Sequence, residues 1–312
     1  MSDHTRDEPR RIADTHCHTG EGPLYHPDEN SLYWVDIPAG DLYRYEPAID
    51  ANGRDAGGEY EQVLDYDGTI GGYTVQESGD LLLFCDRGTI RPWNAESGLG
   101  DPVVEEIPEE RDSRFNDVIA DPEGRVYCGT MPTEDGGGRL YRLDTDGSLT
   151  TLETGVDIPN GLGFAPDRNR LYFTETEADR IYRYRYDRET GALSNRETFV
   201  DTSDVEGFPD GMTVDAEGHV WSAFWDGGRV KRYAPDGTEK RRVEFPAKKV
   251  SAIAFGGSDF ETAYVTTALG PGEGRAGTRE EEGDGAGALF AVDLGVGGVP
   301  EFRSAVGEYS RI

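Results

Sequence analysis

A pattern that repeats along the chain constrains the fold of this sequence more than any other feature. Six times, a polar turn is followed by a β-rich run, a short loop and a second β-rich run. The first runs of the six repeats begin 43 to 49 residues apart, at Leu32, Leu81, Val126, Leu171, Val220 and Ala263. This spacing is the length of one four-stranded blade of a β-propeller.

The residues around each hairpin agree with this interpretation. The preceding turns read HPDEN, QESGD, DPEGR, APDRN, DAEGH and GSDFE, and they are rich in the residues that tight turns require. A short apolar stretch with small residues precedes each turn, which suits a crowded innermost strand. We therefore predict an all-β protein over residues 1–312: one domain, a six-bladed β-propeller with four-stranded antiparallel blades around a central channel.

Two segments do not fit the repeat. Residues 1–12 are polar and charged, and we expect a flexible N-terminus there. Residues 270–287 read GPGEGRAGTREEEGDGAG and interrupt the sixth repeat. Because this composition buries little apolar surface, we expect an acidic, glycine-rich, solvated loop within the last blade.

The charge of the chain limits its partners. There are 62 acidic and 31 basic residues, a net charge of −31, and this field disfavours nucleic acid as a ligand. Such an acid-rich, lysine-poor composition is typical of extreme halophiles, whose molar salt reduces the Debye length to ~3 Å. No apolar run approaches about eighteen residues, so we expect no membrane partner. The N-terminus lacks an apolar export signal, and a cytoplasmic location is expected.

The cysteines and histidines predict neither a disulfide framework nor a zinc site. Three cysteines, at positions 17, 85 and 128, lie far apart in the sequence. His16-Cys17-His18 resembles a metal-binding cluster, but a strand would place the two histidines on one face and Cys17 on the other. No second Cys/His pair completes a tetrahedral site.

Alignment of the repeats brings six positions together at one end of the predicted channel. Each position opens an innermost strand, and all these strands start at the same end. The six residues are Glu21, Gly71, Asn116, Asn160, Asp210 and Ser251. Five of the six are polar and two are carboxylates, so we expect a polar mouth.

Carboxylate and amide oxygens around one cavity are typical of a site for a hard divalent cation. Glu21 and Asp210 would balance the charge of the ion, and Asn160 would add a carbonyl oxygen. The alternative is that these residues only cap turns, since each precedes a glycine. We favour the metal site because clustered carboxylates would repel one another without a cation. Ca²⁺ is the favoured ion, with Mg²⁺, Mn²⁺ and Zn²⁺ as alternatives.

Five segments in order resemble the regucalcin (senescence-marker-protein) and gluconolactonase family. They are HTGEGPLYHPDENSLYWVDI, RFNDVIADPEGRVYCGTM, IPNGLGFAPDRNRLYFTE, FPDGMTVDAEGHVWSAFWDGGRVKRYAPDG and VSAIAFGG, and they extend from His18 nearly to the C-terminus. The resemblance implies a six-bladed propeller with one divalent metal held by a Glu, an Asn and an Asp. These ligands correspond to Glu21, Asn160 and Asp210, the residues selected by repeat position.

The same resemblance implies that Arg114 and Asn116 bind the substrate. The guanidinium fork of Arg114 and the carboxamide of Asn116 can form hydrogen bonds with a polyol. The alternative roles are a surface salt bridge for Arg114 and a turn cap for Asn116. We expect Glu134, after the VYCGTM strand, to reach the same end of the channel and to accept a hydrogen bond from a sugar hydroxyl. The sequence departs from the family pattern at Val118 and at Glu175-Thr176, and we expect these changes to affect the shape of the pocket.

Together these features predict metal-dependent hydrolysis of a sugar lactone to the aldonic acid, with pentonolactones (xylono- or arabinonolactone) favoured over gluconolactone. The cation would polarise the carbonyl, and either Asp210 or the metal would activate the water. None of the five histidines lies in a nucleophile-elbow motif with a serine. Alternatives are a calcium-dependent phosphotriester or aryl-ester hydrolase and a non-catalytic calcium-binding scaffold. The oligomeric state stays open.

Overall fold

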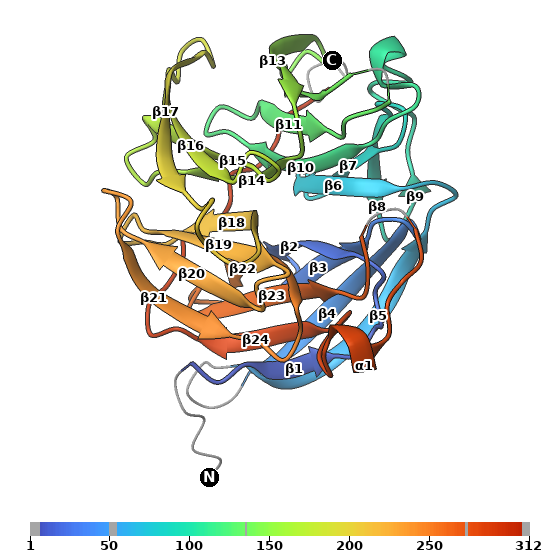
Figure 1. Cartoon of the computed structure of the whole chain (residues 1–312). Coiled ribbons are helices and arrows are strands. Elements are labelled where there is room, and N and C mark those ends of the chain that lie inside the picture. The colour runs from blue at the N-terminus through green and yellow to red at the C-terminus, as the bar shows by residue number, and fades with distance from the viewer. Residues whose placement is uncertain (1–6, 50–54, 135, 272–273, 308–312) are drawn as a thin grey trace. The chain divides into compact units, whose positions relative to one another are not determined.

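The structure is a computed structural model that describes residues 7–49, 55–134, 136–271 and 274–307. Its strands form six four-stranded antiparallel sheets, and the chain is a six-bladed β-propeller, as predicted. The chain divides into two compact units of three blades each (Figure 1). The first unit comprises Met1–Asp65 and Asp204–Pro300, and the second comprises Tyr66–Ser203 and Glu301–Ile312.

The first unit holds the first, fifth and sixth blades. The first blade consists of β2 (Gly20–His26), β3 (Ser31–Asp36), β4 (Asp41–Ile49) and β5 (Asp55–Asp65). The fifth consists of β18 (Phe208–Val214), β19 (Val220–Trp225), β20 (Arg229–Tyr233) and β21 (Glu239–Glu244). The sixth consists of β22 (Lys249–Gly256), β23 (Thr262–Ala268), β24 (Leu289–Asp293) and β1 (Arg10–Ala13). Strand β22 packs against both β18 and β2.

The second unit holds the second, third and fourth blades. The second blade consists of β6 (Ile70–Val75), β7 (Leu81–Cys85), β8 (Ile90–Asn94) and β9 (Gly98–Leu99), followed by a 3₁₀ helix, η1 (Pro108–Glu110). The third consists of β10 (Phe115–Ala120), β11 (Val126–Thr130), β12 (Gly138–Leu143) and β13 (Leu149–Val156). The fourth consists of β14 (Pro159–Phe164), β15 (Arg170–Glu175), β16 (Arg180–Tyr186) and β17 (Leu193–Asp201). Strand β10 packs against both β6 and β14.

The repeated pairs of β-rich runs form the central hairpin of each blade. The first strand of the hairpin is buried along its whole length in the first, second and third blades, at β3, β7 and β11. Strands covered on both faces read as continuous apolar runs rather than as an alternating pattern. This explains sequences such as LYWVD and LLLFC, which lack the period of two expected for a half-exposed strand.

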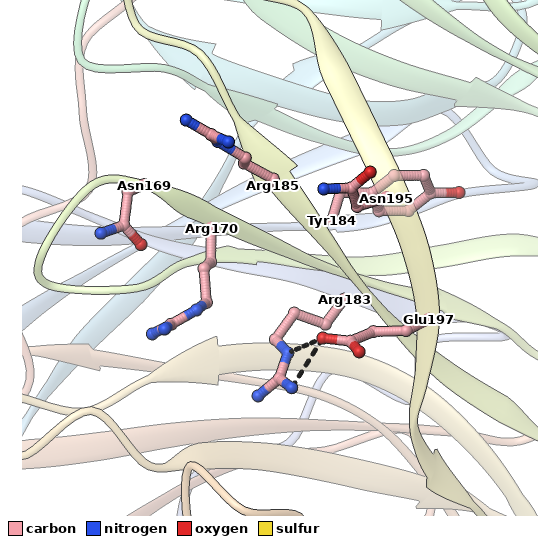
Figure 2. Close-up of a pocket in the computed structure, with 7 residues that line it drawn as sticks. All are labelled: Asn169, Arg170, Arg183, Tyr184, Arg185, Asn195 and Glu197. Atoms are coloured by element: carbon pink, nitrogen blue, oxygen red, sulfur yellow. Dashed lines mark hydrogen bonds and ion pairs between the residues drawn. The ribbon is translucent and has the colours of Figure 1, made fainter.

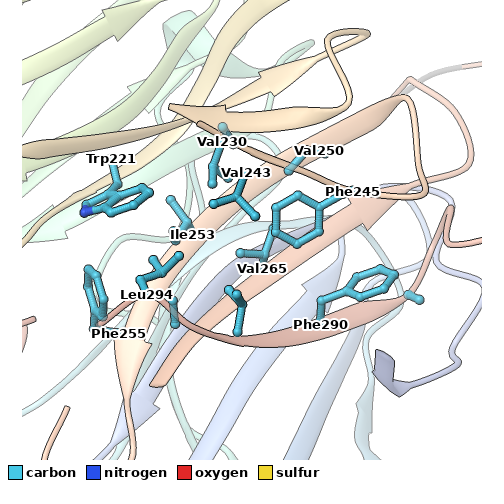
Figure 3. Packing of buried hydrophobic residues seen from close by; sticks show 14 residues of the cluster. Trp221, Val230, Val243, Phe245, Val250, Ile253, Phe255, Val265, Phe290 and Leu294 are labelled. Atoms are coloured by element: carbon cyan, nitrogen blue, oxygen red, sulfur yellow. The ribbon is translucent and has the colours of Figure 1, made fainter. Parts of the chain in front are cut away.

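Neighbouring blades of a unit share hydrophobic cores. In the first unit, aromatic and β-branched residues of the fifth and sixth blades pack together (Figure 3). Phe245 and Phe290 meet edge to face, with ring centroids 5.6 Å apart. Trp221 and Val265 are fully buried in the same cluster. Such packing fixes the orientation of one blade against the next, and removing one of these aromatic rings typically costs about 3–5 kcal/mol.

The N-terminal segment completes the sixth blade. Strand β1 pairs antiparallel with β24, so the flexible segment expected to extend to residue 12 is instead ordered from Arg10. Arg10 Nη2 donates to the carbonyl oxygen of Asp55 at 2.8 Å, and the Asp55 carboxylate accepts hydrogen bonds from Tyr45 and Tyr264 at 2.8 and 3.3 Å. Residues 1–6 lie outside the described part of the chain.

The described part of the 270–287 segment is held against the first unit by ion pairs, although several of its residues, among them Glu280, Glu281 and Asp284, are exposed as expected. It contains a short helix, α1 (Arg279–Glu282), which lies near β1 in Figure 1. Lys249 Nζ contacts Glu282 at 2.5 Å and Asp226 at 2.9 Å, and Arg279 binds Asp14. These ion pairs hold the segment although its own sequence offers little apolar surface.

Candidate metal and substrate site

A register break recurs in the first strand of every blade. In each case this strand has one residue more than its partner, which is a β-bulge. Five of the six aligned positions lie within the breaks, at Gly71, Asn116, Asn160, Asp210 and Ser251, and Glu21, which pairs with Val35, borders the break of its strand. Bulges re-aim side chains and are common beside active sites. The repeat alignment thus identified structurally equivalent positions.

The three predicted metal ligands lie within strands, so the turn-cap alternative is wrong for them. Glu21 lies on β2 and Asp210 on β18 of the first unit, and Asn160 lies on β14 of the second. They are buried, with exposed fractions of 5%, 3% and 6%, respectively. Burying polar groups costs free energy unless hydrogen bonds or ions compensate, which is consistent with a functional role.

Glycine geometry shapes the strand around Glu21. The Glu21 Oε2 atom accepts a hydrogen bond from the Gly22 amide at 3.0 Å, and Gly22 has a φ of +58° that favours glycine. The carbonyl of Gly20 accepts a hydrogen bond from Ser251 Oγ at 2.5 Å. Through this hydrogen bond Ser251, which is fully buried, links β22 to the strand that carries Glu21.

The backbone of β18 is pressed against β22 directly after Asp210. A Cβ atom added at Gly211 would lie 2.5 Å from Ala252 Cβ and 2.8 Å from the Ser251 carbonyl oxygen. Glycine is therefore required here by close approach and not by a turn. Ser251 touches the strands of both predicted carboxylate ligands of the first unit.

The side chain of Asn160 is anchored at its nitrogen. Nδ2 donates to Thr176 Oγ1 at 3.1 Å, whereas the buried Oδ1 accepts no hydrogen bond from the described residues. A buried acceptor left in this way costs about 1–3 kcal/mol. A cation beside Oδ1 would remove that cost, so the chemistry of Asn160 fits a metal ligand. Thr176 was recognised from the sequence only as a departure from the family pattern, not as the partner of Asn160.

Arg114 and Asn116 form a connected pair in the second unit. Arg114 Nη1 donates to Asn116 Oδ1 at 2.8 Å and to the Phe115 carbonyl at 2.9 Å. Asn116 Nδ2 donates to the Pro159 carbonyl at 2.9 Å, which joins β10 to the residue before Asn160. The alternatives of a surface salt bridge for Arg114 and a turn cap for Asn116 do not describe these contacts.

Asp117 follows Asn116 in the same bulge and is electrostatically perturbed. Desolvation raises the pKa of Asp117 to about 7, although the Arg114 guanidinium acts in the opposite direction. Perturbed carboxyl groups of this kind are concentrated at functional sites. The sequence alone does not reveal this perturbation, because the desolvation of Asp117 depends on the packing of neighbouring strands.

Two other predicted features remain, a glutamate in a turn and a His-Cys-His segment. Glu134 lies in the turn between β11 and β12 and is exposed. The His16-Cys17-His18 segment is not a strand, contrary to expectation: His16 is exposed with a φ of +56°, and Cys17 is buried. No group of three His, Cys, Asp or Glu side chains within the described ranges is placed to hold a metal. The predicted ligand set differs in kind, since one of its three members is an amide.

Comparison with known proteins assigns the chain to a family. The family model described as the SMP-30/Gluconolactonase/LRE-like region matches residues 19–269. The chain belongs to the SMP-30/gluconolactonase/LRE-like family. The resemblance seen in the sequence motifs is thereby confirmed.

Members of the SMP-30/gluconolactonase/LRE-like family resemble this chain along nearly its whole length. Pentonolactonase XacC of Haloferax volcanii is 53% identical over 298 residues, which cover 95% of this chain and 98% of that protein. A 6-deoxy-6-sulfogluconolactonase of Pseudomonas putida is 33% identical and covers 90% of this chain and 93% of its own. The crystal structure of a calcium-binding protein, regucalcin, from Agrobacterium tumefaciens has a TM-score of 0.83 and 27% identity, with coverages of 95% and 97%.

No helix in the described part of this family member has the length and apolar character needed to cross a bilayer.

Proposed function

We propose that this protein hydrolyses a sugar lactone to the corresponding aldonic acid with the aid of one divalent cation, and that pentonolactones are its preferred substrates. The observation that carries the substrate class is the 53% identity to a pentonolactonase over nearly the full length of both chains. The related 6-deoxy-6-sulfogluconolactonase supports lactone hydrolysis more broadly.

We assign the cation to Glu21 and Asp210 of the first unit and Asn160 of the second. All three offer oxygen donors, which hard divalent ions prefer, and Asn160 Oδ1 is a buried acceptor that the described residues leave unsatisfied. Ca²⁺ is our first choice because a related structure is that of a calcium-binding protein. Mg²⁺, Mn²⁺ and Zn²⁺ are the ions to compare with it.

The proposed reaction adds water to the lactone carbonyl carbon and breaks the ring C–O bond. When bound, the cation would supply Lewis-acid polarisation of that carbonyl. Asp210 would accept a proton from the attacking water as its oxygen bonds to carbon. The ring oxygen leaves as the new hydroxyl group and takes up the proton that Asp210 accepted, which yields the aldonic acid.

Arg114 and Asn116 would bind the hydroxyl and carbonyl oxygens of the sugar. Each amide or guanidinium nitrogen can donate to such oxygens, and the hydrogen bond between the two side chains limits their freedom before substrate arrives. Glu134, which lies in an exposed turn, would accept a hydrogen bond from a sugar hydroxyl.

Replacing Asp210 tests this proposal most simply. Asp210→Asn keeps the size of the side chain but removes its charge and basicity, and we expect lactone hydrolysis to fall by about 10²-fold or more. A pH-stat would follow xylono-, arabinono- and gluconolactone with each ion restored to metal-stripped protein at high salt. The exposed Asp146→Asn serves as the matched control. Full activity of Asp210→Asn would rule out Asp210 as base and metal ligand. If the wild-type protein hydrolysed paraoxon-type esters but not lactones, the proposed substrate class would be wrong.

A further inference from the structure

A cavity lies on strands β15, β16 and β17 of the fourth blade, and the residues that line it are not those assigned to the metal or the substrate. Its volume is about 470 Å³, within the range of small-molecule sites. Figure 2 shows the residues that line it, which come from β15, β16, β17 and the turn before β15: Asn169, Arg170, Arg183, Tyr184, Arg185, Asn195 and Glu197. We call it the arginine pocket.

Three arginine side chains line the arginine pocket of a chain whose net charge is −31, and in Figure 2 the Arg185 side chain extends away from those of Arg170 and Arg183. Arg183 and Arg185 are two residues apart on β16 and so share a face of the sheet. Arg170 on β15 stands directly opposite Arg185 in the strand register. Like charges directly opposite each other in a sheet are destabilising, so a bound anion would stabilise this pairing.

The acidic side chains near the arginine pocket neutralise only part of its positive charge. Glu197 Oε1 accepts from Arg183 Nε at 2.8 Å and from Nη2 at 2.7 Å, and it is the single carboxylate of the lining. Asp167, outside the lining, contacts Arg170 at 3.4 Å. Arg185 forms no ion pair with a described acid, although its charge reaches Asp187 two residues further along the chain.

The outer strand is bent beside these arginines. The register between β16 and β17 breaks between Arg183 and Arg185, and Asn195 in the resulting bulge has a φ of +52°. Bulges re-aim side chains at binding sites. Asn195 and Asn169 place two carboxamides around the guanidinium groups, and these can bind hydroxyl groups of a ligand.

We propose that the arginine pocket binds a small phosphate monoester that also carries hydroxyl groups. Guanidinium forks match the oxygens of phosphate, and a phosphate dianion would balance the opposed pair of Arg170 and Arg185. The cavity is large enough to hold the organic part as well as the phosphate. This proposal does not depend on the lactonase assignment.

Isothermal titration calorimetry tests it with three probes: inorganic phosphate, glycerol 3-phosphate and glycerol. The titrations use the lowest KCl concentration at which circular dichroism shows the full chain folded, because chloride screens and competes. We expect glycerol 3-phosphate to bind more tightly than inorganic phosphate, and glycerol alone not to bind. Arg185→Gln should weaken phosphate-ester binding by about tenfold or more.

Arg188→Gln is the control, since Arg188 is exposed, pairs with Glu123 and lies outside the pocket lining. It should leave the affinity unchanged. If the wild-type chain binds neither phosphate probe, or if both variants weaken binding equally, the pocket is not a phosphate site. Equal affinity for inorganic phosphate and glycerol 3-phosphate would overturn the assignment of an ester. Circular dichroism of each variant shows whether it is folded, and Arg170→Gln provides a second variant of the same pair if Arg185→Gln is not.

Discussion

At the scale of single residues, Asn160 links the sequence to the proposed chemistry. Its carboxamide nitrogen is held by Thr176 and its oxygen is buried without a hydrogen bond from the described residues. The repeat alignment predicted Asn160, Glu21 and Asp210 as equivalent positions because a bulge recurs in each blade. It could not predict Thr176 as an anchor, because this contact depends on how β14 and the end of β15 are registered.

Removing the anchor should weaken the cation site. Thr176→Val keeps the shape of the side chain but loses the hydroxyl that orients Asn160. We expect the affinity for Ca²⁺ to fall by about 10–100-fold, as is typical of residues that orient metal ligands. Calorimetry on metal-stripped protein measures it directly. Thr174→Val is the matched control, because Thr174 is buried on β15, two residues before Thr176, and its hydroxyl has no hydrogen-bond partner in the described residues. Equal affinities of the two variants would contradict the role given to Thr176.

Asp117 makes stability depend on pH. Because desolvation raises its pKa to about 7, the folded chain binds this proton more tightly than the unfolded chain does. The resulting stabilisation is fully present below the unfolded pKa and is lost as the pH rises towards about 7.

We therefore expect the free energy of unfolding of Asp117→Asn to exceed that of the metal-stripped wild type by more than about 1 kcal/mol at about pH 8, with a smaller difference at about pH 5. Thermal unfolding across this range checks the prediction. Asp146→Asn, at an exposed carboxylate, should show no such trend between these pH values. A constant difference for Asp117→Asn would mean that its carboxyl group is not perturbed.

At the scale of elements, the six central hairpins could be predicted because their signals are local. Runs such as LYWVD and turns such as HPDEN contain all the information that a hairpin needs. The partner of β24 could not be predicted in this way. Strand β1 reads RRIA, and it becomes a strand only because the edge of β24, almost at the other end of the chain, offers it hydrogen bonds. The helix α1 likewise depends on distant partners, among them Lys249 and Asp14.

Asp55 links the first blade to the sixth. Its carboxylate accepts hydrogen bonds from Tyr45 and Tyr264 and forms an ion pair with Arg10 at 3.3 Å. Asp55→Ala leaves these buried partners without an acceptor, and we expect it to lower the free energy of unfolding by about 2–4 kcal/mol. Denaturant unfolding measures the loss. Asp65→Ala, at the exposed end of the same strand, should change stability by less than about 0.5 kcal/mol. Similar losses of unfolding free energy in both variants would show that the contacts of Asp55 do not stabilise the fold.

At the scale of the whole molecule, charge sets the conditions under which the fold is stable. The net charge of −31 produces repulsion that the ion pairs on the surface cannot cancel, since exposed pairs contribute only about 0–1 kcal/mol each. High salt screens this repulsion. The 53% identity to a protein of Haloferax volcanii agrees with the halophilic character indicated by the composition.

We expect the unfolding temperature to fall by more than about 10 °C when KCl is lowered from about 2 M to about 0.1 M, because the Debye length grows to about 10 Å. Circular dichroism at several salt concentrations measures this change. The same series in the presence of sucrose shows whether general exclusion from the surface, rather than screening, stabilises the chain. An unfolding temperature that does not depend on salt would contradict the halophilic interpretation.

The central proposal is that Glu21, Asn160 and Asp210 bind one divalent cation that lactone hydrolysis requires. Calorimetric titration of Ca²⁺ into metal-stripped protein tests it most directly, with Glu21→Gln altering the first unit and Asn160→Ala the second. The account predicts one site per chain in the wild type, a loss of about tenfold or more in affinity in each variant, and recovery of lactonase activity that follows occupancy of that site. Unchanged Ca²⁺ affinity in either variant, or full lactonase activity without any divalent ion, would contradict it.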